Sequence, residues 1–568
     1  MVKTRKMLVM VLALVLASAM MLAACQGDAP APAPGSAIDA PAGHNPRAFQ
    51  PVPEGPWNTP YELPVHVTAV ASHASNWHYE DGDDIHNNPW IRLYQDELNI
   101  HVTWDWVVID NYDHRLNMTV AAGMLPDVFM IDRTTPLLFN QLQEAGMLLD
   151  LTDAYNAYTS ERVRSAELAD PLTIQGYTVD GRIYGIPRYY YGQIDQPWHL
   201  WVRKDWYEAA GSPEIRTVED FENLAHHFMS EYGGYGLSVH RELQWLFRTA
   251  PMFDAYVGNI FNNQYFWMPD ETGRIKPGIA FPEFLTALEY WQRWFAEGII
   301  SPDFVTMDEQ RAGEDIVNGR VGIQCWWQWW GWMWGMNTVA MQQNDDAYFI
   351  PLNLPTVAGD RPAKGQIFYP NMGVIAASAD FQNPAALMKI LSILDHMVYS
   401  PDANLTPEEL HYYMADGREH AMTGTFSRID PLTDMIQFQH VNHALQTGDT
   451  SQLFTTGMQM KYNDSVMWIN DKNPTGLGSY LQQGFPESAY GRSQHLFDNG
   501  WVITTALWGP EPVEFSEAGS TGDIIIEEVM QIIMGNKPVS HFEIVLEQWY
   551  AQGGQIKEDA VNKLYGGN

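Results

Sequence analysis

The order of hydrophobic and polar residues predicts short strands that alternate with amphipathic helices. Runs rich in β-branched and aromatic residues, typical of strands, lie at 65–70, 101–109 and 127–131. Between the first two, Asn88 and Pro89 supply an N-cap and a first-turn proline for a helix. Strands that alternate with helices in this way predict an α/β fold with parallel sheets and helices on their faces.

Helix signals are clearest in the middle of the chain. The segment 281–298 has Pro282 near its start and Gly298 at its end, as a helix requires. Its apolar stripe consists of Phe284, Leu288, Trp291 and Phe295. Another helix is predicted to begin after Thr217, because Thr217 and Asp220 have the spacing of a capping box.

The N-terminus has the pattern of a secretion signal. Basic residues precede an apolar run at 7–21, and Leu-Ala-Ala follows directly before Cys25. This arrangement resembles the signal of bacterial lipoproteins, which implies that residues 1–24 are removed and that Cys25 is acylated. The alternative is an uncleaved membrane anchor, but the run is shorter than the ~20 apolar residues that span a bilayer.

Residues 25–60 are expected to form a tether. From residue 26 to residue 60 there are nine prolines and almost no apolar periodicity, so an extended, semi-rigid linker is predicted. No later segment has an apolar run of spanning length without charges or prolines. Contact with the membrane is therefore expected through the N-terminal lipid only.

The charge and cysteine content exclude several classes of partner. The chain has 69 acidic and 32 basic residues, a net charge of −37, which argues against nucleic acid and against a basic patch for anionic lipid. Two cysteines are present. If Cys25 carries lipid, no intrachain disulfide can form, and the apolar neighbours of Cys325 predict a buried, inert thiol.

A series of motifs follows the predicted tether. They are AAGMLPDVFMIDR (121–133), LQEAGMLLDLTDAY (142–155), GRIYGIPRYY (181–190), LWVRKDWYEAAG (200–211), EYWQRWFAEGIISPDF (289–304), VNGRVGI (317–323), ALWGPEP (506–512) and VMQIIMGNKPVSHFEIVLEQWYAQGG (529–554). In this order they resemble the extracellular solute-binding proteins of bacterial carbohydrate ABC importers, in the lipoprotein group related to alginate- and oligosaccharide-binding proteins. The resemblance covers nearly all of the predicted mature chain.

The resemblance implies an α/β fold of the type 2 periplasmic-binding-protein kind. Two lobes, each an αβα sandwich, would be joined by hinge crossings and hold the ligand between them. Lobe I would comprise 61–197 and 366–440, and lobe II 198–365 and 441–568. The implied function is that of a monomeric, lipid-anchored extracytoplasmic receptor, without a cofactor, that captures an oligosaccharide and delivers it to ABC permease subunits.

Many relatives carry an Asp-x-Asn-x-Asn-Gly calcium loop that this chain lacks. The corresponding region, 229–240, reads MSEYGGYGLSVH, and the acidic stretch at 80–84 lacks EF-hand spacing, so no metal site is expected. The chain also has no Gly-x-Ser-x-Gly or His-Glu-x-x-His motif. A surface glycan hydrolase or lyase, and a sugar-sensing or cell-wall-binding module without a permease, remain the alternative functions.

The densest cluster of candidate residues lies at 325–335, which reads CWWQWWGWMWG. Leaving its six indoles exposed would forfeit ~12–18 kcal/mol, so most must be covered. A strand ending at Cys325 followed by a helix would put Trp326, Trp330 and Trp334 on one helical face and Trp329 and Trp332 on another. One face would then pack on the lobe and the other would line the cleft.

Indoles can stack on the apolar face of a pyranose ring and donate an N–H to its hydroxyls. The resemblance to sugar-binding proteins adds polar residues that follow predicted strands. The predicted ligand-binding residues are Trp77, Asp132, Arg133, Arg188, Tyr190, Trp245, Trp326, Trp327 and Trp329. The alternatives are core packing for each tryptophan, a helix cap for Asp132 and a surface ion pair for Arg188.

Overall fold

The computed structural model describes residues 56–72, 79, 82–132, 135–169, 171–189, 192–262, 264–335, 341, 344–368, 371–399, 426, 433–509 and 511–566. All of them belong to one compact unit, Ile38–Asn568. Within these ranges no helix is both long and apolar enough to cross a membrane. The predicted signal, the predicted acylation site Cys25 and most of the tether fall outside the described residues.

A five-stranded sheet has the strand order β2-β1-β3-β15-β6. Its strands are β1 (Val65–Ser72), β2 (Ile100–Val108), β3 (Val128–Asp132), β6 (Gly185–Tyr189) and β15 (Asn371–Ala377). The three predicted strands are confirmed, and β1 is parallel to both β2 and β3. The expectation of a purely parallel sheet is wrong, because β15 enters from a distant part of the chain and runs antiparallel to β3 and β6.

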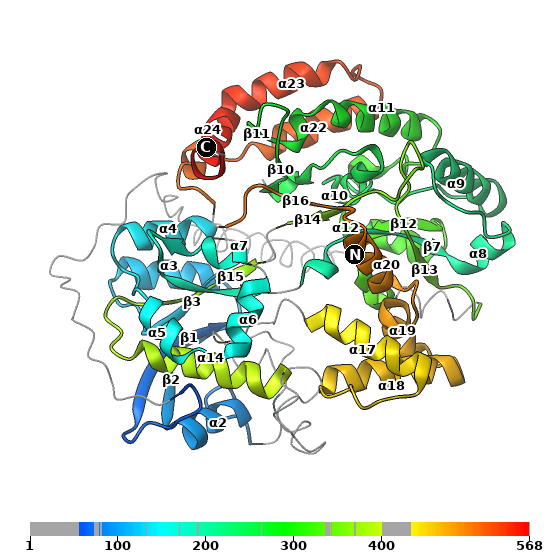
Figure 1. Ribbon diagram of the computed structural model, residues 1–568. Helices are drawn as coiled ribbons and strands as arrows, with labels where there is room; N and C mark the ends of the chain where they lie inside the picture. The colour runs from blue at the N-terminus through cyan, green and yellow to red at the C-terminus, as the bar shows by residue number, and fades with distance from the viewer. Residues whose placement is uncertain are drawn as a thin grey trace, which may run out of the picture. The chain divides into compact units, whose positions relative to one another are not determined.

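Helices cover both faces of this sheet (Figure 1). The alternation along β1 puts Val67 and Ala69 on one face and Val70 on the other. The first face packs against α2 (Pro89–Leu98), α5 (Thr152–Tyr158) and α14 (Pro384–Tyr399). The second packs against α3 (Tyr112–Ala121) and α4 (Pro136–Glu144). The remaining elements in this part of the chain are α6 (Glu161–Ala169), α7 (Pro171–Gln175), β4 (Thr178–Val179) and β5 (Arg182–Ile183).

The predicted helix starts are confirmed at atomic detail. Asn88 Oδ1 accepts hydrogen bonds from the N–H groups of Trp90 and Ile91 at 3.1 and 3.2 Å, so it caps α2. The Thr217 hydroxyl accepts from Asp220 N–H at 3.0 Å, and the Asp220 carboxylate accepts from Thr217 N–H at 2.8 Å. This capping box begins α9 (Val218–Tyr232).

A second sheet has three strands in the order β12-β7-β13. They are β7 (His199–Arg203), β12 (Ile323–Trp326) and β13 (Phe349–Leu352). Both neighbours run antiparallel to β7, so the parallel pattern predicted from sequence is wrong for this sheet as well. Its central position is held by β7, which directly follows the chain segment that leaves the five-stranded sheet.

The largest hydrophobic core packs around one side of the three-stranded sheet. Residues from 198–363 and from 515–561 contribute to it, and α11 (Pro282–Ala296) packs on α22 (Gly522–Ile533) within it (Figure 1). Phe284, Leu288 and Trp291 are buried along α11, as the predicted stripe requires, whereas Phe295 is only partly buried. The other helices of this part are α8 (Lys204–Ala209), α10 (Gln244–Phe247), α12 (Glu309–Val317), α21 (Phe515–Ala518), α23 (His541–Trp549) and α24 (Gln555–Tyr565).

The remaining elements are short strands and a group of four helices. The strands form the pairs β8 (Gly258–Asn259) with β9 (Gln264–Tyr265), β10 (Trp267–Pro269) with β11 (Ile275–Pro277), and β14 (Gly365–Ile367) with β16 (Val502–Thr504). The helices are α17 (Thr433–Thr447), α18 (Thr456–Asp471), α19 (Leu477–Gln483) and α20 (Ala489–Asp498). Of these, α19 packs directly against the tryptophan-rich segment.

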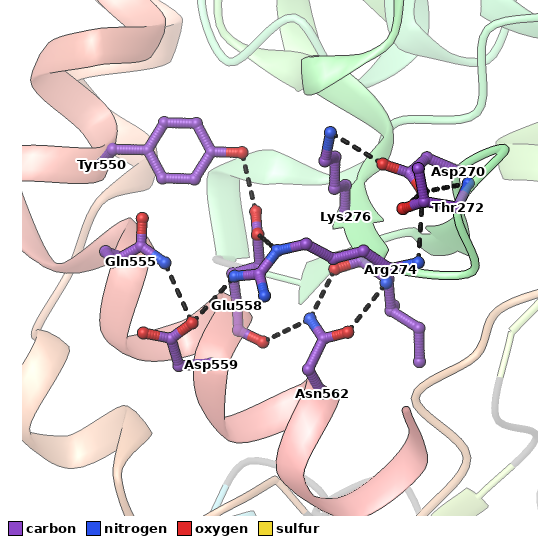
Figure 2. A network of polar contacts seen from close by, with 10 residues as sticks. Asp270, Thr272, Arg274, Lys276, Tyr550, Gln555, Glu558, Asp559 and Asn562 are labelled. Atoms are coloured by element: carbon purple, nitrogen blue, oxygen red, sulfur yellow. Dashed lines mark hydrogen bonds and ion pairs between the residues drawn. The ribbon is translucent and has the colours of Figure 1, made fainter. Parts of the chain in front are cut away.

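The C-terminal helix α24 is tied to the β10–β11 hairpin by charged and polar contacts (Figure 2). The Arg274 guanidinium reaches both Glu558, at 2.6 Å, and Asp559, at 2.8 Å. Asn562 exchanges two hydrogen bonds with the backbone of Ile275, at 2.7 and 2.9 Å. Tyr550 donates its hydroxyl to the Glu558 carboxylate at 2.7 Å. These contacts fix the end of the chain to the largest core.

Candidate functional site

The tryptophan-rich segment continues from a strand into a 3₁₀ helix. Trp326 is the last residue of β12 and pairs with His199 on β7, and the helix η6 spans Gln328–Gly335. The prediction of an α-helix with Trp326 on one face is therefore wrong. Trp326 is paired with His199 in the sheet, and the helix begins two residues later. In a 3₁₀ helix, residues three apart share a face, so the predicted four-residue spacing does not apply. The side chains of Trp332 and Trp334, part of the same prediction, lie outside the described residues.

The indoles of this segment differ sharply in exposure. Trp326 and Trp330 are fully buried, and so is Trp245. They share a core with Trp201 and with residues of α19. Trp327 is half-buried, and Trp329 is 36% exposed. Of the predicted stacking residues described by the structure, Trp245 and Trp326 therefore support the site from the interior, and Trp327 and Trp329 present ring surface.

The two accessible indoles form a stack, which we call the indole pair (Trp327 and Trp329). Their ring centroids are 5.8 Å apart and their planes differ by 13°. The Trp326 ring stands nearly perpendicular to both, at centroid distances of 5.7 and 5.8 Å. The guanidinium of Arg248 lies over Trp327, with Cζ 4.3 Å from the ring centroid, and over Trp326 at 3.7 Å. Trp329 thus supplies the most exposed ring of an ordered aromatic group.

Buried hydrogen bonds hold the backbone that carries the indole pair. Gln328, between the two indoles, donates from Nε2 to Asp195 Oδ1 at 2.9 Å and accepts from Gln482 Nε2 at 2.8 Å. The Tyr490 hydroxyl donates to the same Asp195 oxygen at 2.5 Å. The indole N–H of Trp201 donates to the backbone carbonyl of Trp327 at 3.0 Å. We call Asp195, Gln328, Gln482 and Tyr490 the Asp195 network.

Burial changes the acid–base properties of the groups around this segment. It raises the pKa of the Asp195 carboxyl well above its ordinary value, and the nearby Asp434 raises it further. Burial lowers the pKa of the Lys461 ammonium, which hydrogen-bonds Gln482, to about 8. It also lowers the pKa of Arg248 to about 9 and that of His240 to about 4. The site thus combines aromatic surface with buried ionisable groups.

Cys325 is buried, as predicted, and burial raises the pKa of its thiol. Its Sγ lies 3.1 Å from the backbone oxygen of Arg248. Among the residues that the structure describes, no group of three or more His, Cys, Asp or Glu side chains could hold a metal ion.

The other predicted site residues lie on the five-stranded sheet or outside the described residues. Asp132 ends β3 opposite Gly373 on β15, and the N-cap position of α4 is taken by Thr135 rather than Asp132. Arg188, on β6, is half-buried, with Nη1 2.8 Å from the sulfur of Met130. Trp77, Arg133 and Tyr190 fall outside the described residues. The ligand contacts predicted for these five residues stay predictions.

Sequence reasoning missed Asp195, Gln482, Tyr490 and Arg248. The partners in the Asp195 network are up to 295 positions apart, and no motif surrounds any of them. Gln328 alone left a signal, as the single polar residue inside an aromatic run.

Comparisons with known sequences give two curated relatives, whereas no family model matches the chain. Lipoprotein LipO of Bacillus subtilis is 21% identical over 491 residues, which cover 84% of this chain and 89% of LipO. The polygalacturonan/rhamnogalacturonan-binding protein YtcQ of the same bacterium is 22% identical over 243 residues, covering 41% of this chain and 44% of YtcQ.

Comparisons with solved structures show the fold. A solute-binding protein from Bifidobacterium longum infantis, described as HMO-binding and ABC-transporter-associated, matches with a TM-score of 0.57 and 15% identity, over 89% of this chain and 98% of the other. The alginate-binding protein AlgQ2 matches with a TM-score of 0.52 and 15% identity, over 89% of this chain and all of AlgQ2. FusA of S. pneumoniae, in complex with fructo-nystose, has a TM-score of 0.52 and 12% identity, over 89% and 99% of the chains.

The mixed α/β architecture expected from sequence is therefore that of the periplasmic solute-binding proteins. Together with the ordered motifs along the chain, these relatives confirm the resemblance read from sequence. The chain therefore has the fold of the periplasmic solute-binding proteins and is similar in sequence to a bacterial lipoprotein and to a polysaccharide-binding protein.

Proposed function

We propose that this protein is a lipid-anchored extracytoplasmic receptor that captures an oligosaccharide between two lobes and delivers it to an ABC permease. The observation that carries the proposal is the indole pair, in which Trp329 is 36% exposed and stacked on Trp327. Burying an indole gains ~2–3 kcal/mol, and Trp329 is the tryptophan that stands out among the exposed large hydrophobic residues of the described ranges. A ligand with an apolar face would recover part of that gain.

A pyranose ring has the chemistry that fits this surface. Its C–H groups are apolar and partly positive, so they suit the negative face of an indole. The ring hydroxyls would bind polar side chains around the stack, and Asp132 and Arg188 on the other sheet are our candidates. The names of YtcQ, AlgQ2 and FusA refer to polygalacturonan, to alginate and to a fructo-oligosaccharide complex, which supports an oligosaccharide as the ligand class.

The proposed lobes are built around the two sheets, with the boundaries 61–197 and 366–440, and 198–365 and 441–568. The chain passes between the sheets after β6 and again before β15. These two passages are bonded to each other: Gln196 Nε2 donates to Phe368 O at 3.0 Å, and Phe368 N–H donates to Gln196 Oε1 at 2.5 Å. Paired crossings of this kind suit a hinge about which lobes close on a ligand.

The anchor and the delivery step complete the proposal. Acylated Cys25 would hold the protein at the extracytoplasmic face of the cell membrane through the tether at 25–60. The relative LipO is named as a lipoprotein. A tether lets the body reach permease subunits while it remains near the membrane. We propose that the protein acts as a monomer.

Binding is tested by isothermal titration of the predicted mature chain with Cys25→Ser, which keeps it free of lipid, against neutral and acidic oligosaccharides. We expect saturable binding of at least one glycan and a change in tryptophan fluorescence. Trp329→Ala should weaken that binding by about tenfold to hundredfold, because one stacking contact is worth roughly 1–3 kcal/mol. Trp501→Ala, a half-buried indole outside the aromatic segment, is the matched control. Tight binding of peptides with no binding of any glycan would overturn the proposal.

A further inference from the structure

Arg248 is a buried cation that forms no ion pair with any residue described by the structure. It follows α10 and is only 5% exposed. Its buried Nη1 has no hydrogen-bond partner among the described residues. A buried charge that is left unpaired is unfavourable, so proteins keep one where something else compensates for it or where it has a task.

The contacts of Arg248 compensate for only part of that cost. Its guanidinium lies against the faces of Trp326 and Trp327, and such cation–π contacts are attractive. The faces of indoles accept no bidentate hydrogen bond, so the planar fork of the guanidinium keeps unused donors. The indole N–H of Trp326 is likewise buried without a partner. Two donors without an acceptor, Arg248 Nη1 and Trp326 Nε1, therefore lie next to Trp327 of the indole pair.

The nearby charges do not neutralise Arg248. Burial lowers the pKa of Arg248. The carboxylate of Glu309 opposes this shift electrostatically, without a hydrogen bond to the guanidinium. Burial, Arg248 and Arg241 lower the pKa of His240 to about 4, so this imidazole is neutral at pH 7. Arg248 thus remains a charged group that is buried and makes no direct contact with a carboxylate of the described residues.

We propose that Arg248 recognises a carboxylate on the ligand, so that the receptor selects an acidic oligosaccharide containing uronic acid residues. This inference rests on the proposed function, because it places the acidic group beside a sugar ring stacked on the indole pair. A carboxylate would pair with the guanidinium in a charge-assisted, bidentate manner, and it would neutralise the buried charge. A neutral hydroxyl at the same position could accept a hydrogen bond but would leave the charge uncompensated.

The competing explanation is that Arg248 only props the indoles through its stacking contacts. An arginine that only supports the indole rings would change the affinity for all sugars equally, whereas one that binds a carboxylate distinguishes acidic from neutral ligands. The test therefore first compares the affinities of an acidic and a neutral ligand for the unaltered protein, and then compares variants. The probes are trigalacturonate and the same trisaccharide with its carboxyl groups reduced to alcohols, which preserves ring size, linkage and stacking face.

On the unaltered mature chain we expect trigalacturonate to bind about tenfold to hundredfold more tightly than its reduced form, as a charge-assisted hydrogen bond predicts. Arg248→Met should remove that preference, and Arg248→Lys should retain part of it. Arg216→Met, which alters an exposed arginine before α9, is the matched control and should leave the preference unchanged. Thermal unfolding of each variant identifies any that does not fold, and the comparison of the two ligands needs no variant.

Equal affinity of the unaltered protein for both trisaccharides would overturn the role of Arg248. So would an equal loss of affinity for both in a folded Arg248→Met variant. Binding of neutral oligosaccharides alone would overturn the acidic specificity and leave the proposed function standing. Failure of every glycan, neutral and acidic, would overturn the proposed function and this inference with it.

Discussion

Replacing Asp195 tests whether the Asp195 network holds the indole pair in place. Its Oδ1 accepts from Gln328 at 2.9 Å and from Tyr490 at 2.5 Å, and its Oδ2 accepts from the N–H of Gly192 at 2.8 Å. Asp195→Ala would remove the acceptor of these three buried donors, of which Tyr490 keeps a second hydrogen-bond partner in Asp434. Each such donor costs about 1–3 kcal/mol, and local rearrangement recovers part of the sum. We therefore expect the free energy of unfolding to fall by about 3–5 kcal/mol.

The isosteric variant Asp195→Asn separates lost hydrogen bonds from general damage to the core. An amide oxygen can still accept from Gln328 and Tyr490, but the amide N–H₂ then faces the N–H of Gly192. One unsatisfied donor predicts a loss of about 1–3 kcal/mol, smaller than in the alanine variant. Both variants should also weaken sugar binding, because Gln328 lies between the two stacked indoles.

Thermal unfolding followed by tryptophan fluorescence measures these losses. The described residues belong to one compact unit, Ile38–Asn568, and at that size an unfolding entropy of ~2.1 cal/mol/K per residue makes 1 kcal/mol equal to about 1 °C, so Asp195→Ala should lower the Tm by roughly 3–5 °C. Asp449 is a control of the same residue type, since its exposed carboxylate accepts from Ser451 N–H at 2.9 Å, and Asp449→Ala should leave the Tm unchanged. Equal shifts for the alanine and asparagine variants of Asp195, or no shift in either, would refute the reasoning.

Three further predictions concern charge and packing elsewhere. Burial lowers the pKa of Lys461 to about 8, below its unfolded value of about 10.4. Between these values the unfolded chain binds more protons, so urea midpoints should rise with pH in the unaltered protein and stay flatter in Lys461→Met. Arg274→Ala deprives the buried Glu558 of its cation and should cost about 1–2 kcal/mol in urea unfolding, whereas Lys563→Ala, at an exposed ion pair, should change nothing measurable. Trp330→Ala removes a fully buried indole and should cost about 3–5 kcal/mol; a smaller loss of stability than that from Trp329→Ala would contradict the assigned burial.

Features that depend on neighbouring residues could be predicted from the sequence. The start of α2 follows from Asn88 and Pro89, and the start of α9 from the capping box at Thr217, because each signal lies within four residues of the bond it makes. The buried stripe of α11 follows from its own periodicity in the same way. The resemblance to solute-binding proteins could be recognised because its motifs keep their order along the chain.

Features that depend on distant residues could not be predicted. The direction of β15 is set by strands that lie about 180 positions or more earlier in the chain. Trp326 is a strand residue rather than a helical one because His199 pairs with it, and no local pattern shows that pairing. Arg248 is separated from Trp326 by 77 intervening positions of folded chain, so its place against the indoles emerges only from tertiary packing. The sequence therefore located the aromatic segment but not which rings face outward.

The reactivity of the Cys325 thiol can report the local opening of β12. If Cys25 carries lipid, Cys325 is the sole free thiol, and it is buried in the strand that leads into the indole pair. A thiol reagent can reach it only when β12 separates from its neighbours, so the rate of alkylation counts those openings. A bound sugar that fastens the indole pair should slow the reaction, and the kinetics of ligand release could thus be followed on the native chain without an introduced label.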